Sequence, residues 1–346
     1  MLKKVLLIVL LNVLVFSRSY SQCNNCTLSY TSNTAVSATA DNQTICITGG
    51  SSFTFISAYK NVTVKICAPN VQLTNVQIGS GALNNTIESF GDSTKIGTLV
   101  SEADTFSFVM HNVGASISNA TINGITSFHT TSGASFTMTQ NLNPGKKIFF
   151  TLDKNSTMNV ADVTSNSGGQ IKVGKNASFN SSGKIILQND GFILNNGTIT
   201  SAGDFTVQSG NNALTNFCGE STITIGGIFI INAGKLYNAG YIKAATIIVN
   251  ANAGPVYPNQ GSTIEATVKL ETTNATNFFS GDSMATGQCA LFKIPAYGSW
   301  NAPLSSSPLL KYCGPTVSAS LLGLATADCN CSSQPALCTP LCTAPT

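Results

Sequence analysis

Between residues 156 and 254, glycine recurs at a nearly constant spacing. The glycines that close successive units stand 14 residues apart, except for one shorter and one longer step: Gly169, Gly183, Gly197, Gly210, Gly226, Gly240 and Gly254. Each unit carries two short apolar stretches separated by small or polar residues, as in residues 184–197 (KIILQNDGFILNNG). One such unit cannot bury its apolar face alone, so the units must stack into a continuous core. The repeat therefore predicts a solenoid.

The apolar stretches predict short β-strands, because they are rich in Ile, Val, Phe and Thr. Pairs such as Ser182-Gly183 and Asn196-Gly197 supply turns in which Gly tolerates a positive φ. Two units, about 28 residues, would make one coil, and a coil of about 20 residues with three short strands is the alternative. In both geometries, Asn side chains at the turns can stack and share amide hydrogen bonds. A β-sandwich also has short strands, but it does not require Gly at a constant spacing. We expect an all-β chain folded as a right-handed parallel β-helix, or β-solenoid.

The ends of the chain differ from the repeat. Lys3 and Lys4 precede the apolar run 5–16 and small residues near Ser21, which is typical of a secretory signal over residues 1–21. A lipid-modified start at Cys23 is the alternative, although Gln22 stands where such cleavage needs a small residue. The run is too short to span a bilayer, so we expect no transmembrane segment in the mature chain. The remaining boundaries are expected at 22–40 for a Cys-containing segment or cap, 41–280 for the solenoid, and 281–346 for an irregular Cys/Pro-rich cap or tail.

The charge balance argues against nucleic acid as a partner. The chain has 17 Lys and Arg against 14 Asp and Glu, and removing Lys3, Lys4 and Arg18 with the signal leaves 14 against 14. Arg18 is the only Arg, and Arg is the preferred residue for forked recognition of phosphate. Without a basic surplus there is no counterion-release contribution to binding of DNA or RNA.

Eleven Cys in an exported chain predict disulfides. Cys46 and Cys67 each follow an Ile in a β-rich stretch. If the interval between them is one coil, the two strands are neighbours about 4.8 Å apart, which is within bridging distance. We predict these cysteines in register and bridged or able to bridge, with buried free thiols as the alternative. The other cysteines expected in disulfides are Cys23, Cys26, Cys289, Cys313, Cys329, Cys331, Cys338 and Cys342.

No catalytic motif occurs in the sequence: there is no Gly-x-Ser-x-Gly, no His-Glu-x-x-His, no phosphate loop and no EF-hand spacing. We interpret His111 and His129 as structural, although Glu102 and Asp104 lie near them. We therefore expect a non-enzymatic protein with no cofactor and no metal site. Two alternatives stay open. One is a polysaccharide lyase or hydrolase, whose carboxylates would have to meet across coils. The other is an ice- or crystal-surface binding protein, because Thr-x-Thr occurs three times, at 137/139, 198/200 and 222/224.

Four passages carry a resemblance to a known group of proteins: residues 22–26 (QCNNC), 43–50 (QTICITGG), 62–67 (VTVKIC) and 307–313 (SPLLKYC). With them the chain resembles the secreted, Asn/Thr/Ser/Gly-rich β-helical surface proteins of Bacteroidota-type bacteria, many of which leave the cell by the type IX pathway. Members typically continue into a C-terminal sorting domain, and this chain stops at Thr346 without one. The resemblance implies a secreted, extracellular or cell-surface, adhesin-like protein. We expect a neutral polar surface whose partners are glycans, extracellular matrix or neighbouring cells.

Overall fold

The chain forms a parallel β-solenoid, which confirms the predicted fold class. The computed structural model describes residues 23–142, 147–208, 213–216, 219–272, 286, 288–295, 305, 308–316 and 319–331. The predicted signal, residues 1–21, lies outside the described residues, as do Cys338 and Cys342. The described chain divides into two compact units, 1–139 and 140–346.

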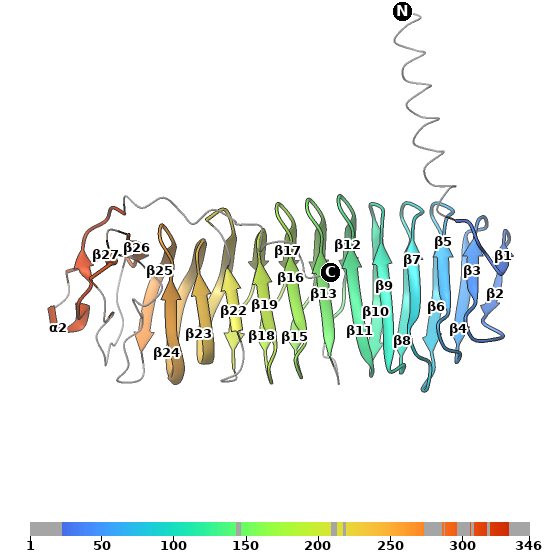
Figure 1. The fold of residues 1–346 in the computed structure, drawn as a ribbon, viewed down its shortest axis with the longest axis horizontal. Helices are drawn as coiled ribbons and strands as arrows, with labels where there is room; N and C mark the ends of the chain where they lie inside the picture. Colours follow the sequence, from blue (N-terminus) through green and yellow to red (C-terminus); the bar gives the residue numbers. More distant parts are fainter. Residues whose placement is uncertain are drawn as a thin grey trace, which may run out of the picture. The chain divides into compact units, whose positions relative to one another are not determined.

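The strands of the first unit are β1 (Leu28–Tyr30), β2 (Thr34–Ser37), β3 (Thr44–Ile47), β4 (Ser52–Ser57), β5 (Thr63–Ile66), β6 (Gln72–Ile78), β7 (Asn85–Ser89), β8 (Lys95–Ser101), β9 (Thr105–Met110), β10 (Ala115–Ile122), β11 (Ile125–Thr130) and β12 (Ser135–Met138). Each strand pairs in parallel with the strand two places further along the chain. Figure 1 shows the resulting rungs, with β3, β5, β7 and β9 side by side.

The core of the first unit is built from inward-facing columns. Alternate residues of each strand point inward, so one position per rung repeats from coil to coil. One such column runs through Ile45, Val64, Ile87, Phe108 and Phe128, all of which are fully buried. Burying side chains of this size contributes about 1.5–3 kcal/mol each, which explains how a chain of short strands can hold together.

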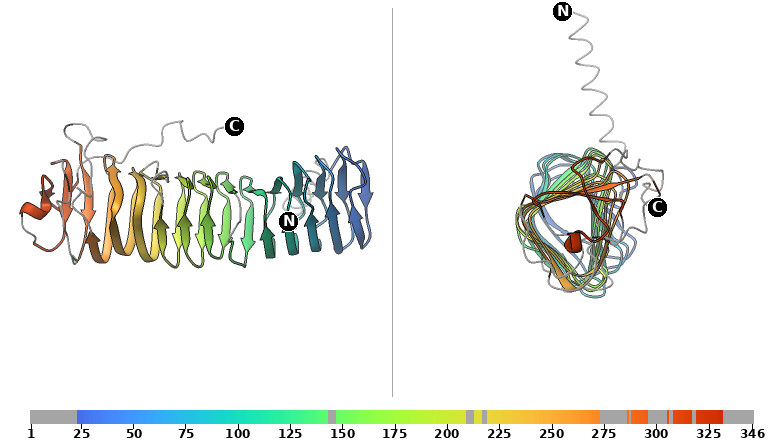
Figure 2. Two further views of the ribbon diagram at one scale, coloured as in Figure 1. Left: turned by 90° about the horizontal axis from the view of Figure 1, so that it is seen from below. Right: turned by 90° about the vertical axis from the view of Figure 1, so that its left-hand side faces the viewer.

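The strands of the second unit are β13 (Ile148–Leu152), β14 (Thr157–Val160), β15 (Val163–Ser165), β16 (Gln170–Val173), β17 (Ser178–Ser181), β18 (Ile185–Leu187), β19 (Phe192–Asn195), β20 (Thr198–Ser201), β21 (Phe205–Val207), β22 (Ala213–Asn216), β23 (Thr222–Asn238), β24 (Tyr241–Pro258), β25 (Thr263–Thr272), β26 (Ala290–Lys293), β27 (Leu310–Cys313) and β28 (Thr326–Ala327), with one short helix, α2 (Ala319–Leu322). From β13 to β20 each strand pairs in parallel with the third strand after it. β21 pairs with the long strand β23, which also pairs with β20. In the left view of Figure 2 these coils, coloured from green to yellow, follow one another as parallel rungs.

One coil of the second unit takes 20 to 22 residues between β13 and β22, in three short strands. The alternative geometry is therefore the correct one, and the longer coil made of two glycine-spaced units is wrong. Each strand with its corner takes about a third of the coil. The interval from one closing glycine to the next consequently covers two corners out of three, not half a coil.

The closing glycines are needed for a different reason from the one that the sequence predicts. Gly183, Gly197 and Gly240 are not among the residues with a positive φ. A Cβ at Gly197 would instead lie 2.3 Å from the backbone oxygen of Ala177, in the preceding coil. Close approach of backbone between coils, rather than a left-handed turn, excludes a side chain there.

The predicted turn amides do stack. In the first unit Asn42, Asn61 and Asn84 all have a positive φ, which Asn tolerates better than most residues. The Asn61 amide donates to Asn42 Oδ1 at 2.9 Å, and the Asn84 amide donates to Asn61 Oδ1 at 3.3 Å. These amides connect successive corners and satisfy one another's hydrogen-bonding groups.

Parallel pairing extends beyond both predicted solenoid boundaries. Within 22–40, β1 and β2 already pair with β3 and β4. After residue 281, β26, β27 and β28 continue the parallel ladder that begins with β25. The end segments therefore belong partly to the solenoid. Their strands are short, and their sequences lack the glycine spacing that marks the middle of the chain.

Disulfides join cysteines of the first and last coils, but one predicted pairing is wrong. Cys46 lies opposite Lys65, not Cys67, because the step from β3 to β5 is shorter than the interval between the two cysteines. Among the described residues, the pairs formed are Cys23–Cys67, Cys26–Cys46, Cys289–Cys331 and Cys313–Cys329, with Cα–Cα distances of 6.3, 5.7, 5.7 and 4.5 Å. Cys46 and Cys67 are thus each bonded to the segment that precedes β1.

Candidate functional site

Two tyrosines stack on the outside of the second unit, near the end of β23 and of β24. Tyr237 lies opposite Thr215 on one side and Tyr257 on the other. The tyrosine rings are nearly parallel, at 15°, with centroids 4.9 Å apart. Leu236 and Val256, the residues before them, point into the core and are buried, so the strand alternation directs both tyrosines outward. The side chain of Tyr237 is 39% exposed.

A buried amide ladder fixes the corner next to these tyrosines. The Asn195 amide donates to Asn216 Oδ1 at 2.9 Å, and the Asn216 amide donates to Asn238 Oδ1, also at 2.9 Å. All three side chains are at most 1% exposed. Asn195 and Asn238 also accept from the backbone N–H of Gly197 and Gly240, at 3.1 and 3.3 Å. Because its polar groups are engaged inside the coil, the ladder positions the corner instead of offering itself to a ligand.

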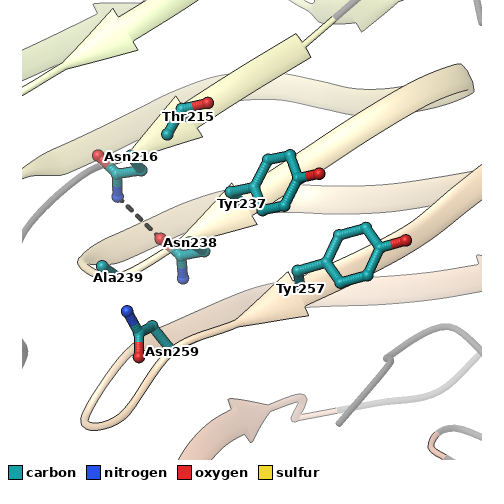
Figure 3. Close-up of a pocket in the computed structure, with 7 residues that line it drawn as sticks. All are labelled: Thr215, Asn216, Tyr237, Asn238, Ala239, Tyr257 and Asn259. Carbon is teal, nitrogen blue, oxygen red and sulfur yellow. Dashed lines mark hydrogen bonds between the residues drawn. The ribbon is translucent and has the colours of Figure 1, made fainter. Parts of the chain in front are cut away.

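A pocket of about 330 Å³ lies between the tyrosines and this corner. Its lining is drawn in Figure 3 and consists of Thr215, Asn216, Tyr237, Asn238, Ala239, Tyr257 and Asn259. Both tyrosine hydroxyls point in the same direction, away from the amide corner (Figure 3). Within the described part of the chain neither hydroxyl has a hydrogen-bond partner. The pocket thus combines aromatic surface with neutral polar groups at its margin.

A second, wider hollow of about 460 Å³ in the same unit is lined by side-chain amides: Gln188, Asn189, Gln208 and Asn232. Gln188 donates to Gln208, and Asn189 donates to Asn166 Oδ1 at 2.8 Å. These residues occupy equivalent corner positions on successive coils, after β15, β18 and β21. The hollow therefore presents neutral donors and acceptors without an aromatic surface.

A small charged cluster lies where β24 meets β25. The Tyr241 hydroxyl donates to Glu265 Oε2 at 2.8 Å, and Lys243 Nζ lies 3.7 Å from Glu265 Oε1. Burial, followed by the hydrogen bond and the charge of Glu265, raises the pKa of Tyr241 well above its ordinary value of 10.0. Among the described residues this cluster contains one carboxylate.

The two histidines, which we interpreted as structural, do not stand opposite each other on their neighbouring coils. His111 stacks on Phe90 with ring centroids 4.3 Å apart. His129 lies on the next coil but pairs with Val109, two positions from His111. Glu265 and Glu271, which are near each other in the sequence, form ion pairs with different lysines, Lys243 and Lys269.

The tyrosine pair was not predicted from the sequence. The interval from Tyr237 to Tyr257 is close to one coil, and each tyrosine stands shortly before an Asn, Asn238 or Asn259. A coil length of about 20 residues would have placed them on neighbouring rungs. The spacing of the two tyrosines therefore indicated the pair, but a coil of about 28 residues would not place them on neighbouring rungs.

Among the described residues, no His, Cys, Asp and Glu side chains gather in a group of three or more that could hold a metal ion. In the described ranges no helix has the length and apolar character needed to cross a bilayer. Comparisons with protein-family models, curated proteins and solved structures found no match to this chain.

Proposed function

We propose that the protein is an exported, non-enzymatic structural or adhesion-type protein whose solenoid surface contacts glycans, matrix or cells. The observation that carries the proposal is the stacked pair Tyr237 and Tyr257 beside a pocket with neutral polar margins. A sugar ring has an apolar C–H surface and a rim of hydroxyls. Tyrosine offers an apolar ring and a polar hydroxyl on one side chain, which suits both parts.

The pair is preorganised for such contacts. Each ring limits the rotation of the other, and the buried Asn216–Asn238 bond holds the adjoining corner in place. A ligand that binds there does not have to order flexible side chains first, which reduces the entropic cost of binding. The outward direction of both rings also leaves the core unaffected by substitution of either tyrosine.

Two further features support export and surface placement. Disulfides such as the four between described cysteines are typical of proteins outside the reducing cytosol. The resemblance to secreted β-helical surface proteins of Bacteroidota-type bacteria agrees with this placement, and we propose that origin as well.

The direct test is a glycan array probed with the secreted product of the full chain, beside the variants Tyr237→Ala and Tyr257→Ala. We expect binding to a limited set of glycans that each variant weakens about tenfold or more, as removal of a stacked aromatic anchor does. Tyr59→Ala is a matched control, because Tyr59 is also 39% exposed but lies in the first unit. Equal weakening by Tyr59→Ala, or no glycan bound, would overturn the proposal.

Turnover assays separate this proposal from the polysaccharide lyase or hydrolase. Such an enzyme needs paired carboxylates, or an acid with a basic partner, at the scissile bond. The Tyr241–Lys243–Glu265 cluster is the candidate site for such an activity, because it places an acid beside a basic residue. Release of reducing ends from any bound polysaccharide, abolished by Glu265→Gln, would replace the adhesion proposal with the enzymatic one.

A second candidate function is favoured by a separate observation on the face formed by β20 and β23. Thr198 lies opposite Thr222, and Thr200 lies opposite Thr224, so two Thr-x-Thr pairs are in register on adjacent coils. The Thr222 hydroxyl donates to Thr198 Oγ1 at 3.2 Å. A regular hydroxyl array of this kind suits contact with ice or another crystal surface. Inhibition of ice recrystallisation that is lost in Thr200→Lys and kept in Tyr237→Ala would support this second function.

A further inference from the structure

The tyrosines belong to a larger surface of the second unit, which we call the tyrosine face. It consists of the outward side chains of β13, β16, β19, β22 and the last part of β23 and β24. The strand register places them in two rows, one of Phe149, Gln170, Phe192 and Lys235, and one of Thr151, Lys172, Leu194, Thr215, Tyr237 and Tyr257. None of these side chains is buried. The face therefore combines rings, an aliphatic side chain and polar groups in one continuous strip.

The charge on this face is of one sign. Its charged side chains are Lys172 and Lys235, and no Asp or Glu occurs among the residues of the two rows. No salt bridge to either lysine is formed by the described residues. Elsewhere in the same unit Lys243 and Lys269 do pair, with Glu265 and Glu271.

The corners that border the face do not neutralise it. In the part of the chain that the structure describes, they carry three acids, Asp153, Asp190 and Glu220, and three lysines, Lys147, Lys154 and Lys175. Glu220 lies 3.4 Å from Lys175 and is occupied by that pair. Charges of the described corner residues thus balance, and the face itself adds two positive charges, those of Lys172 and Lys235.

The lysines are placed at two distances from the aromatic pair. Lys235 stands two residues before Tyr237 on the same side of β23, about 7 Å along the strand. Lys172 lies in the row of Tyr237, three rungs away and therefore about 14 Å along the ladder. Leu194 and Thr215 fill the rungs between them. A ligand that contacts all of these groups must be an extended chain with rings and with separated negative charges.

We propose that the tyrosine face binds an acidic polysaccharide that contains uronic acids. A sugar ring lies against Tyr237 and Tyr257, and carboxylates of the same chain lie at Lys235 and Lys172. This inference rests on the proposed glycan-binding function and adds the chemical class of the ligand. The neutral donors at the margin, the tyrosine hydroxyls and Thr215, suit the hydroxyls of a polysaccharide better than the side chains of an acidic peptide.

The test compares a polysaccharide with its own neutral form. The secreted product of the full chain is run through gels that contain polygalacturonate, carboxyl-reduced polygalacturonate or poly-L-glutamate. We expect retardation by polygalacturonate alone, weakened by salt because the ion pairs are exposed. Lys172→Gln and Lys235→Gln should each raise the dissociation constant about two- to fivefold, as for solvent-exposed ion pairs. Lys60→Gln, an exposed lysine of the first unit, makes the same change in net charge and should have no effect.

The other outcomes separate the two levels of the proposal. If the carboxyl-reduced polymer retards the protein as much as polygalacturonate does, and Tyr237→Ala abolishes this retardation, the inference of an acidic ligand is wrong. The proposed glycan-binding function would then still hold. Equal retardation by poly-L-glutamate would show that the face recognises charge on a peptide and would overturn the inference as well. No retardation by any polysaccharide, together with an empty glycan array, would overturn the inference and the proposed function together.

Discussion

The side-chain amide of Asn216 donates a hydrogen bond of 2.9 Å to the Oδ1 of Asn238, one coil further along the second unit, and both side chains are buried. This bond is the second of two in a ladder that begins at Asn195 and supports the corner beside the tyrosine pair. Substitution of Asn216 therefore measures how much a buried side-chain amide contributes to the stability of the solenoid.

Replacing Asn216 with Ala should lower the free energy of unfolding by about 2–3 kcal/mol, because it removes two hydrogen bonds between buried side chains and leaves the buried amides of Asn195 and Asn238 each with one partner fewer. The matched control is Asn180→Ala. Asn180 donates to Asn159 at 3.0 Å in the same unit, but it is only half-buried, so water can replace the bond. Guanidinium unfolding of both variants gives the comparison, and equal losses would contradict a special role for the buried ladder.

Removing the Cys26–Cys46 disulfide should destabilise the first coil. The bond closes a loop of 20 residues, for which the loss of chain entropy in the unfolded state amounts to about 3 kcal/mol. In a Cys26→Ala, Cys46→Ala double variant, amide hydrogen exchange should increase first in β1 and β3. The bond joins the segment just before β1 to β3, and these two strands pair with each other. The Cys23–Cys67 bond is kept and serves as the internal reference. A disulfide-linked peptide joining Cys46 to Cys67 in the native chain would contradict the pairing.

Replacing Gly197 with Ala should be far more harmful than its small size suggests. The new Cβ would lie 2.3 Å from the oxygen of Ala177, so two coils would have to separate at that corner, at a cost of about 3 kcal/mol or more. Gly79→Ala is the control, since its Cβ would meet nothing closer than 3.6 Å. Thermal unfolding of the two variants measures the difference. If both unfold like the parent chain, close approach of the coils is not what selects glycine at residue 197.

The hydrogen bond from Tyr241 to Glu265 predicts a dependence of stability on alkaline pH. Burial and Glu265 raise the pKa of Tyr241 above its ordinary 10.0, so the folded chain keeps a proton that the unfolded chain releases. The contribution is fully present below about pH 10 and is lost as the pH rises from there toward the folded pKa. Ultraviolet titration should show one tyrosine that ionises later than the exposed ones, and Glu265→Gln should move its midpoint downward. An unchanged midpoint would assign the shift to burial alone.

The sequence by itself determined the class of fold and the character of its corners. Alternation such as Thr198-Ile199-Thr200 allows only strands with one buried face, and the repeat leaves stacking as the way to bury it. Asn at turns predicted the stacked amides, because this side chain both tolerates a positive φ and carries a donor and an acceptor. These are local properties, and they can be recognised from neighbouring residues alone.

Only the tertiary structure decided which residues meet from one coil to the next. A regular glycine spacing marks corners but does not say how many corners make a coil. Cys46 faces Lys65 because the step from β3 to β5 ends before Cys67, and Tyr237 meets Tyr257 after register shifts within β23 and β24. Register depends on the summed lengths of strands and corners around each coil, and these sums vary from 20 to 22 residues between β13 and β22, so a constant spacing in the sequence does not identify the partners. The disulfide partners, the tyrosine pair and the two lysines of the tyrosine face all depend on that register.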